Sequence, residues 1–297
     1  MTKTDLYSEV TNRIIADLES GITPWEQPWR GGAMTMPRNH STNRSYSGIN
    51  VLLLWNAQNK GAYDHNRWLT FKQCSDLGGH VRKGSKGTAI VFAKPIVTVA
   101  ERERAKAEQR DARDQMMMRW TTVFNVAQCE NLDLPEIVPA TDPREGIKAA
   151  DELFAATGIA ILNGGSGAFY RPSADVVHMP HRAAFPDLLD YYRTLAHELI
   201  HATGHKSRLD RNIRNKFGSV DYAREELVAE CGAAMLCAVL GIEYTTTHAD
   251  YVGNWLAVLK EDNRAIFRAA SMASKAAQWI EACAVEAVEP ARELAFA

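Results

Sequence analysis

Two short segments, each with a pair of side chains of metal-ligand type four residues apart, constrain the fold of this chain most strongly. In TLAHELIHATGH, residues 194–205, the pair is His197 and His201, and in REELVAECGAAML, residues 224–236, it is Glu226 and Glu230. A spacing of four places both side chains of a pair on one face of a helix, one turn apart. The sequence therefore predicts two packed helices whose facing side chains hold one metal ion.

The histidine helix is expected to run from Pro186, which suits a first helical turn, to about Thr203, with Gly204 as its C-terminal cap. Its HELIH segment follows the HExxH pattern, in which the glutamate beside the first histidine accepts a proton from metal-activated water. Glu198 stands at that position and is the predicted catalytic residue. The pattern is typical of metal-assisted hydrolysis.

A third ligand is needed, because two histidines on a helix often make only local hydrogen bonds. The extended HExxHxxGxxH pattern would place a third histidine at position 207, which is Ser207, and His205 comes two residues too early. We therefore predict Glu226 as the third ligand, with Glu230 orienting a ligand histidine and Glu225 as the lesser candidate. Two histidines and a glutamate favour Zn²⁺, with another divalent transition metal such as Mn²⁺ as an alternative.

Three further residues stand close to these helices in the sequence, namely His205, Arg208 and Tyr222. They could support the centre and steady an oxyanion, although an exposed loop explains them equally well. The alternative to the whole metal centre is a histidine-bearing core helix beside a surface run of glutamates. Two matched pairs on separate helical segments make that alternative less attractive.

The N-terminal part of the chain has a different chemistry. Residues 27–100 hold ten Lys and Arg against two Asp, whereas residues 151–297 hold 14 basic against 19 acidic residues, and five of the seven tryptophans lie in the first 120 residues. Proteins that bind single-stranded DNA combine a basic groove with aromatic faces for base stacking. No pattern of a recognition helix or zinc finger points to duplex DNA. We therefore predict single-stranded-DNA binding by Trp25, Trp29, Arg30, Arg38, Arg44 and Tyr46, together with Arg82, Lys83 and Lys86 at a basic, glycine-rich hairpin tip.

Other tryptophans in this part fit a structural explanation better. Trp55 and Trp68 stand in apolar or helix-flanking segments, and tryptophan is buried on average, so both are predicted core residues. Helices are expected over 4–20, over 48–61 with Ser47 as cap, and over 71–79 with Thr70 as cap. Strands are expected over 89–92 and 121–126, with the charged segment 101–115 between them as a helical insert or mobile arm.

A segment with three prolines, residues 131–143, is expected to link residues 1–130 and 144–297 as two domains. Beyond it the pattern predicts a helix over 144–157, strands over 159–162, 168–170 and 175–179, and then several helices. The last of these strands could offer an edge to an extended peptide substrate. A small sheet followed by helices indicates an α+β fold.

Several of these segments together resemble one known family. YYRTLAHELIHATGHKSRLDR, FGSVDYAREELVAECGAAM and ADYVGNWLAVLKEDNRAIFRAASMASKAAQWI resemble the C-terminal, zincin-like domain of the ArdC-type antirestriction proteins of conjugative plasmids. YSGINVLLLWNAQNKGAYDHNRWLTFKQCSDLGGHVRKGSKGTAIVF resembles the N-terminal domain of that family, which is also similar to the N-terminal region of some plasmid primases. The resemblance implies an α+β, nucleic-acid-binding domain followed by a zincin-like domain of the gluzincin type. It assigns metal binding to His197, His201 and Glu226, and catalysis to Glu198.

The expected function follows from both lines of reasoning. It is an antirestriction protein that binds single-stranded DNA, carries a zinc peptidase-like centre and protects incoming plasmid DNA, with a host restriction or DNA-associated protein as its peptide substrate. The longest aliphatic run, residues 51–55, is too short for a membrane span, so a cytoplasmic protein without a membrane partner is expected. One alternative is a pure DNA-binding protein with a structural metal. Another is a nuclease, although carboxylate-rich sites suit that chemistry better.

Overall fold

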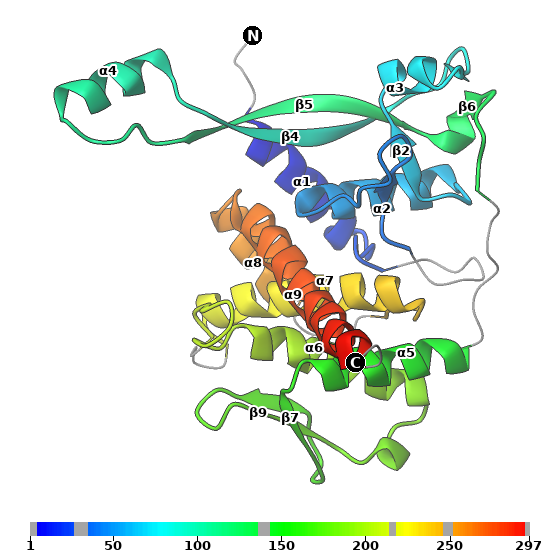
Figure 1. Ribbon diagram of the computed structural model, residues 1–297, viewed down its shortest axis with the longest axis vertical. Helices are drawn as coiled ribbons and strands as arrows, with labels where there is room; N and C mark the ends of the chain where they lie inside the picture. The colour runs from blue at the N-terminus through cyan, green and yellow to red at the C-terminus, as the bar shows by residue number, and fades with distance from the viewer. Residues whose placement is uncertain (1–4, 27–34, 136–142, 214–217, 246–251, 295–297) are drawn as a thin grey trace.

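The computed structural model describes residues 5–26, 35–135, 143–213, 218–245 and 252–294. Trp29 and Arg30, two of the predicted DNA-binding residues, lie outside the described residues. The chain forms an α+β structure, with a sheet and helices of the N-terminal part at one end and a helical C-terminal part with its own small sheet at the other (Figure 1).

The N-terminal part combines helices with a four-stranded sheet. Helices α1 (Leu6–Glu19) and α2 (Ile49–Gly61) are followed by the short α3 (Phe71–Asp76). The sheet has the order β1 (Arg38–Asn39), β2 (Arg67–Leu69), β5 (Gln115–Asn125) and β4 (Thr88–Ile96). A second pair joins β3 (His80–Val81) to β6 (Cys129–Glu130), which follows a 3₁₀ turn, η1 (Val126–Gln128). Trp55 and Trp68 are both fully buried, so their prediction as core residues is confirmed.

Two helix starts in this part test the predicted caps. Thr70 caps α3 in a capping box with Gln73, as predicted. For α2 the prediction of Ser47 was wrong, because the cap is Gly48, with a φ of 60°. Glycine adopts a positive φ without steric cost, and the chain uses it here to turn into the helix.

The strands β4 and β5 of the hairpin are longer than the strands predicted over 89–92 and 121–126. The two strands pair over nine residues each, from Thr88 opposite Val123 to Ile96 opposite Gln115. The charged segment between them forms helix α4 (Val99–Ala107), which lies at the projecting tip of the hairpin (Figure 1). Hydrogen bonds from Arg110 and from the Arg113 amide lower the pKa of Glu101 to about 2 and fix the end of this helix. Of the two alternatives for this segment, a helical insert or a mobile arm, the structure shows the helical insert.

The C-terminal part begins with α5 (Pro143–Ala156) and a three-stranded sheet of order β7 (Ala160–Asn163), β9 (Val176–Met179) and β8 (Phe169–Arg171). Strand β9 pairs parallel with β7 and antiparallel with β8. The expectation that residues 175–179 offer a free edge was therefore wrong, since β9 is the central strand. The edges are β7 and β8.

Helices make up the rest of this part. A 3₁₀ turn, η2 (Arg182–Ala184), leads to α6 (Leu188–Thr203), and α7 (Val220–Leu240), α8 (Val252–Glu261) and α9 (Ala265–Leu294) follow. Asp187 caps α6 through the Leu189 amide, so Pro186 lies before the helix and not in its first turn. Gly204 is the C-cap, but its φ is −74°, and a Cβ there would lie 2.5 Å from Ile213 Cγ2. Close packing, and not a left-handed turn, explains this glycine.

Helices α6 and α7 pack closely enough to exclude a methyl group at their crossing. A Cβ at Gly232 would lie 2.8 Å from Cδ1 of the buried Ile200. Gly232→Ala should therefore lower the free energy of unfolding by up to about 2 kcal/mol, because overpacking outweighs the gain in helix propensity. Urea denaturation measures this. A Cβ at Gly253 in α8 meets nothing within 4 Å, so Gly253→Ala is the control and should stabilise by about 0.4–1 kcal/mol; a stabilising Gly232→Ala would contradict the close contact.

One large hydrophobic cluster runs through both parts of the molecule. It joins residues of α1 and α2 to buried residues of α7, α8 and α9; those of the first two helices include Val10, Ile14, Ile49, Val51, Leu52 and Leu53. Trp25 is 0% exposed and packs edge-on against Trp255 of α8, with ring centroids 5.5 Å apart. Among the described residues, no helix combines the length and the apolar character that a membrane crossing needs.

Candidate functional site

The structure brings the three predicted metal ligands together from two helices. His197 and His201 of α6 have their Nε2 atoms 3.1 Å apart. Glu226 of α7 reaches both, with Oε2 3.4 Å from the Nε2 of His197 and Oε1 3.4 Å from that of His201. All three ligand atoms lie within 4.8 Å of one another.

The charges around these residues suit a bound cation. Four carboxylates surround the two imidazoles, and all are at least nine-tenths buried: Glu198, Glu225, Glu226 and Glu230. An excess of buried negative charge is costly unless a cation balances it. Two imidazole nitrogens and a carboxylate oxygen are also ligands that Zn²⁺ and related divalent transition metals prefer. The residues therefore fit a divalent metal ion.

The imidazoles and Glu226 interact strongly with each other. Burial opposes ionisation of Glu226, but hydrogen bonds with both histidines outweigh it and place the pKa of this carboxyl far below its usual range. Burial likewise opposes a charge on His201, but its carboxylate partners raise the pKa of His201 well above the ordinary value. Glu226 is therefore ionised, whereas His201 has to release its proton when a cation binds.

Each histidine has its own carboxylate behind it, on the ring nitrogen that faces away from the other ligands. Oε1 of Glu230 lies 3.5 Å from Nδ1 of His197, which is the position predicted for Glu230. Oε1 of Glu225 lies 3.3 Å from Nδ1 of His201, although the sequence made Glu225 the lesser candidate. Such partners fix the tautomer and the ring orientation of a ligating histidine.

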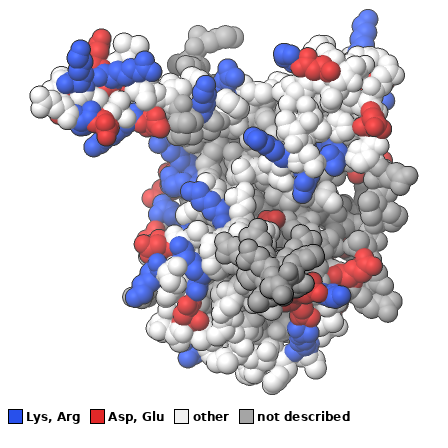
Figure 2. Space-filling model, viewed as in Figure 1, with Lys and Arg blue, Asp and Glu red and all other residues white. Residues whose placement is uncertain are grey.

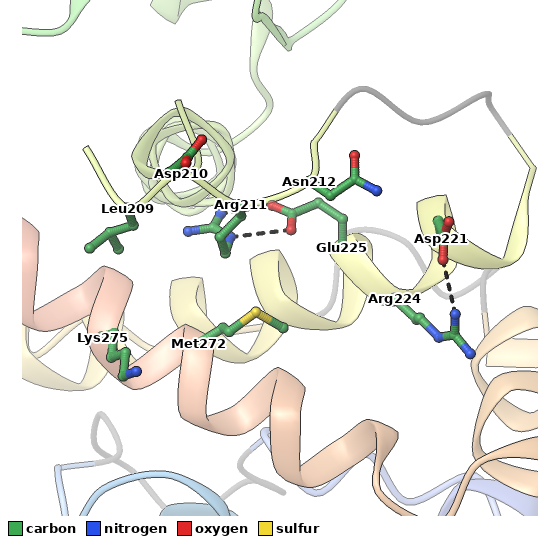
Figure 3. A pocket seen from close by; sticks show the side chains of 9 residues that line it. All are labelled: Leu209, Asp210, Arg211, Asn212, Asp221, Arg224, Glu225, Met272 and Lys275. Carbon is green, nitrogen blue, oxygen red and sulfur yellow. Dashed lines mark hydrogen bonds and ion pairs between the residues drawn. The ribbon is translucent and has the colours of Figure 1, made fainter. Parts of the chain in front are cut away.

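Glu225 is held by an arginine that the sequence did not single out. Arg211 donates to both oxygens of Glu225, at 3.2 and 2.7 Å, and also to Thr203 and to the carbonyl of Ile200. Figure 3 shows this pair on the wall of a cavity of about 540 Å³, which Arg224 and Asp221 also line. The contacts that orient His201 therefore extend through Glu225 to Arg211 on the wall of this cavity.

Glu198 points from α6 toward the small sheet. Its Oε2 accepts a hydrogen bond of 2.7 Å from the backbone amide of Tyr170 in β8. Since β8 is an edge strand of its sheet, this amide faces away from β9 and toward α6. The predicted catalytic carboxylate therefore lies beside the edge strand β8.

Of the three other residues predicted near the centre, Arg208 and His205 both contact Asp175, and Tyr222 stands at the start of α7. Arg208 forms an ion pair with Asp175 and donates to the hydroxyl of Tyr170 at 3.3 Å, and its hydrogen bonds lower the pKa of Asp175. His205 Nδ1 lies 2.8 Å from the Ser207 hydroxyl. Tyr222 stands in the first turn of α7, where its amide bonds to the Ser219 cap. Arg208 thus supports the β8–β9 turn, and Asp175 and Tyr170 are supporting residues that the sequence analysis missed.

Two predicted DNA-binding residues line one cavity between the two parts of the molecule. Arg38 and Tyr46 lie on its N-terminal wall and Glu281 of α9 on the opposite wall, and the volume is about 580 Å³. Arg44, Arg82, Lys83 and Lys86 lie outside this cavity, and all four are exposed.

The prediction that Trp25 binds DNA was wrong, because its side chain is fully buried and has no free ring face on which a base could stack. On the face drawn in Figure 2, the body of the N-terminal part carries scattered Lys and Arg with some Asp and Glu, and the α4 tip also carries both charges.

The fold and the site define a zincin-like metallopeptidase domain joined to a second, N-terminal domain. Two family models match accordingly: a zincin-like metallopeptidase over residues 148–272, and the N-terminal domain of the anti-restriction factor ArdC over residues 4–124. The crystal structure of the antirestriction protein ArdC from plasmid R388 is 40% identical, with a TM-score of 0.79 over 95% of this chain and 98% of that one in its metal-free form. Its Mn(II)-bound form is 41% identical, with a TM-score of 0.77 over 94% and 98%. The chain belongs to the ArdC family of antirestriction proteins, which confirms the resemblance.

Two further relatives extend this comparison. The uncharacterized protein y4eC of Sinorhizobium fredii is 41% identical over 95% of this chain and 93% of its own length. The DNA primase TraC of Escherichia coli is 36% identical over 98% of this chain, but the match spans 29% of the primase. The family thus occurs both as a protein of this size and as part of a larger one.

Proposed function

We propose that this protein is a cytoplasmic antirestriction factor that binds single-stranded DNA and cleaves a protein at a zinc centre, so that incoming plasmid DNA is protected from host restriction. The observation that carries the peptidase part is the convergence of two imidazoles and a buried carboxylate beside Glu198. Membership of the ArdC family supports the antirestriction part. A domain division near residues 131–143 belongs to the same proposal.

His197, His201 and Glu226 would hold the ion, and Glu198 would act on water. When bound, a divalent ion supplies Lewis acidity that makes water a nucleophile near neutral pH. Glu198 accepts the proton of the attacking water and delivers it to the departing amine. The Tyr170 amide keeps the Glu198 carboxylate in place, and an extended substrate peptide pairs with the nearby edge of β8. A host restriction or DNA-associated protein is the proposed substrate.

Metal binding is tested directly by thermal and chemical unfolding. Zn²⁺ or Mn²⁺ at about 100 times its Kd should raise the free energy of unfolding by about 2.7 kcal/mol, because the ion binds the folded chain. His201→Ala should abolish this gain. His205→Ala, which removes a nearby histidine outside the ligand set, should retain it; an equal gain in the His201 and His205 variants would reject the ligand assignment.

DNA binding is proposed for the predicted basic residues of the surface and for the cavity that Arg38 and Tyr46 line. Replacing Lys83 and Lys86 by Ala should weaken binding of single strands of any sequence. The slope of log K against log salt should fall by about 0.7 for each phosphate that the variant no longer neutralises. Fluorescence anisotropy of labelled oligonucleotides measures both effects. Lys106→Ala in α4 is the matched control, and an equal weakening there would show that the DNA binds elsewhere.

A further inference from the structure

Behind the candidate metal centre, a tyrosine beyond the end of α7 contacts one of the buried carboxylates. The helix ends at Leu240, and Gly241 turns the chain with a φ of 69°. The Ile242 amide then bonds to the Cys237 carbonyl at 2.9 Å, which folds the chain back against the helix. This turn brings Tyr244 to Glu230, where its hydroxyl donates to Oε2 at 2.7 Å.

The two oxygens of Glu230 have different partners. Oε2 accepts from Tyr244, while Oε1 faces Nδ1 of His197 at 3.5 Å. Glu230 is 0% exposed and Tyr244 is 4% exposed. A buried carboxylate depends on such donors, because no bulk water replaces them. Burial and the charge of Glu230 raise the pKa of Tyr244 well above its ordinary value, so the phenol keeps the proton that it donates.

We propose that Tyr244 is a positioning residue of the metal centre. Its hydrogen bond holds Glu230 with one oxygen toward Nδ1 of His197, so that His197 carries its proton on Nδ1 and presents the lone pair of Nε2 to the ion. Tyr244 thus acts through Glu230 and touches neither ion nor substrate. The inference rests on the proposed metal centre and extends it by one residue.

Tyr244→Phe removes the hydroxyl and keeps the ring. The affinity for Zn²⁺ or Mn²⁺, measured by isothermal titration calorimetry, should fall about 10- to 100-fold, the loss typical of outer partners of a ligating histidine. Tyr192→Phe is the matched control, because Tyr192 is also fully buried and its hydroxyl also donates to a carboxylate, that of Asp151 at 2.9 Å. Its metal affinity should be unchanged.

A double-mutant cycle with Glu230→Gln separates positioning from a general loss of structure. Glu230→Gln keeps the shape of the side chain but removes the charged acceptor for Nδ1–H, so it should weaken metal binding by itself. Tyr244→Phe on that background should cause no further loss, since Tyr244 acts through the Glu230 carboxylate. Glutamine at position 230 carries no charge, so loss of the Tyr244 hydroxyl leaves no buried charge without a donor. Comparing Glu230→Gln with the double variant is therefore informative even if the single Tyr244→Phe variant folds poorly.

The outcomes are distinguishable. If the wild-type protein binds no divalent ion, the proposed metal centre fails and this inference fails with it. If the wild type binds and Tyr244→Phe binds equally well, the inference alone is overturned. A further tenfold loss in the double variant would also overturn it, because Tyr244 would then act by another route.

Discussion

Replacing Glu198 with Gln is expected to slow peptide hydrolysis by about 10²- to 10⁴-fold, the contribution typical of a positioned general base. The amide is almost the same size as the carboxylate but takes no proton from water. Its oxygen can still accept the hydrogen bond of the Tyr170 amide, so the local structure should persist. Hydrolysis is measured on a quenched fluorescent protein substrate with metal-loaded protein, and calorimetry should show unchanged metal affinity.

The same variant separates peptide cleavage from protection of DNA. If proteolysis protects plasmid DNA, the Glu198→Gln protein should fail in a transformation assay against a restricting host. Full protection by this variant would favour the alternative of a DNA-binding protein whose metal is structural. Lys83 and Lys86 variants in the same assay test DNA binding independently. Comparing the proteins of host cells that express wild type or variant would identify the substrate.

Replacing Arg211 with Met is expected to lower the free energy of unfolding by about 3–5 kcal/mol, because it leaves the buried charge of Glu225 without its arginine partner. The side chains of Arg211 and Glu225 are 6% and 8% exposed, and their atoms approach to 2.7 Å. Urea denaturation of chelator-treated protein measures the loss without a contribution from bound metal.

Arg224 provides the matched control on the wall of the same cavity (Figure 3). Its ion pair with Asp221 is much more exposed, at 38% and 56%, so Arg224→Met should change stability by at most about 1 kcal/mol. Adding Glu225→Gln to Arg211→Met should restore part of the lost stability, since the uncompensated charge disappears. Equal effects of the two arginine variants would contradict the burial of the Arg211–Glu225 pair.

The candidate site was predictable where its chemistry follows local helical spacing. His197 and His201 lie on one helix face because a four-residue period fixes those directions whatever the tertiary structure. Glu226 meets them because α7 packs against α6. The cap at Thr70 was predictable for the same reason, since a capping box lies within four residues.

The partner of each histidine was harder to predict. Helix α7 is buried almost all round, so apolar periodicity does not separate Glu225 from Glu230. Arg211 and Tyr244 reach the centre through turns outside regular helices, and the sequence gives no spacing rule for such contacts. One signal for this pair was present in the sequence: Arg211 follows the histidine helix, and Glu225 directly precedes the predicted ligand Glu226.

Sheet edges and buried tryptophans also depend on contacts between distant residues. The middle position of β9 follows from pairing with both β7 and β8, and alternation along one strand does not reveal its neighbours. Trp25 is adjacent in sequence to prolines and polar residues, which favoured an exposed loop, but it packs against Trp255, 230 positions later.

The hydrophobic cluster that α1 and α2 share with α7, α8 and α9 has a consequence for how this protein can be studied. A chain cut between residues 131 and 143 would leave two fragments, each with a large apolar face in water, and such faces promote aggregation. Heating the intact protein should therefore give one cooperative calorimetric transition, and co-expressed fragments should be recovered together as a complex more readily than either fragment alone.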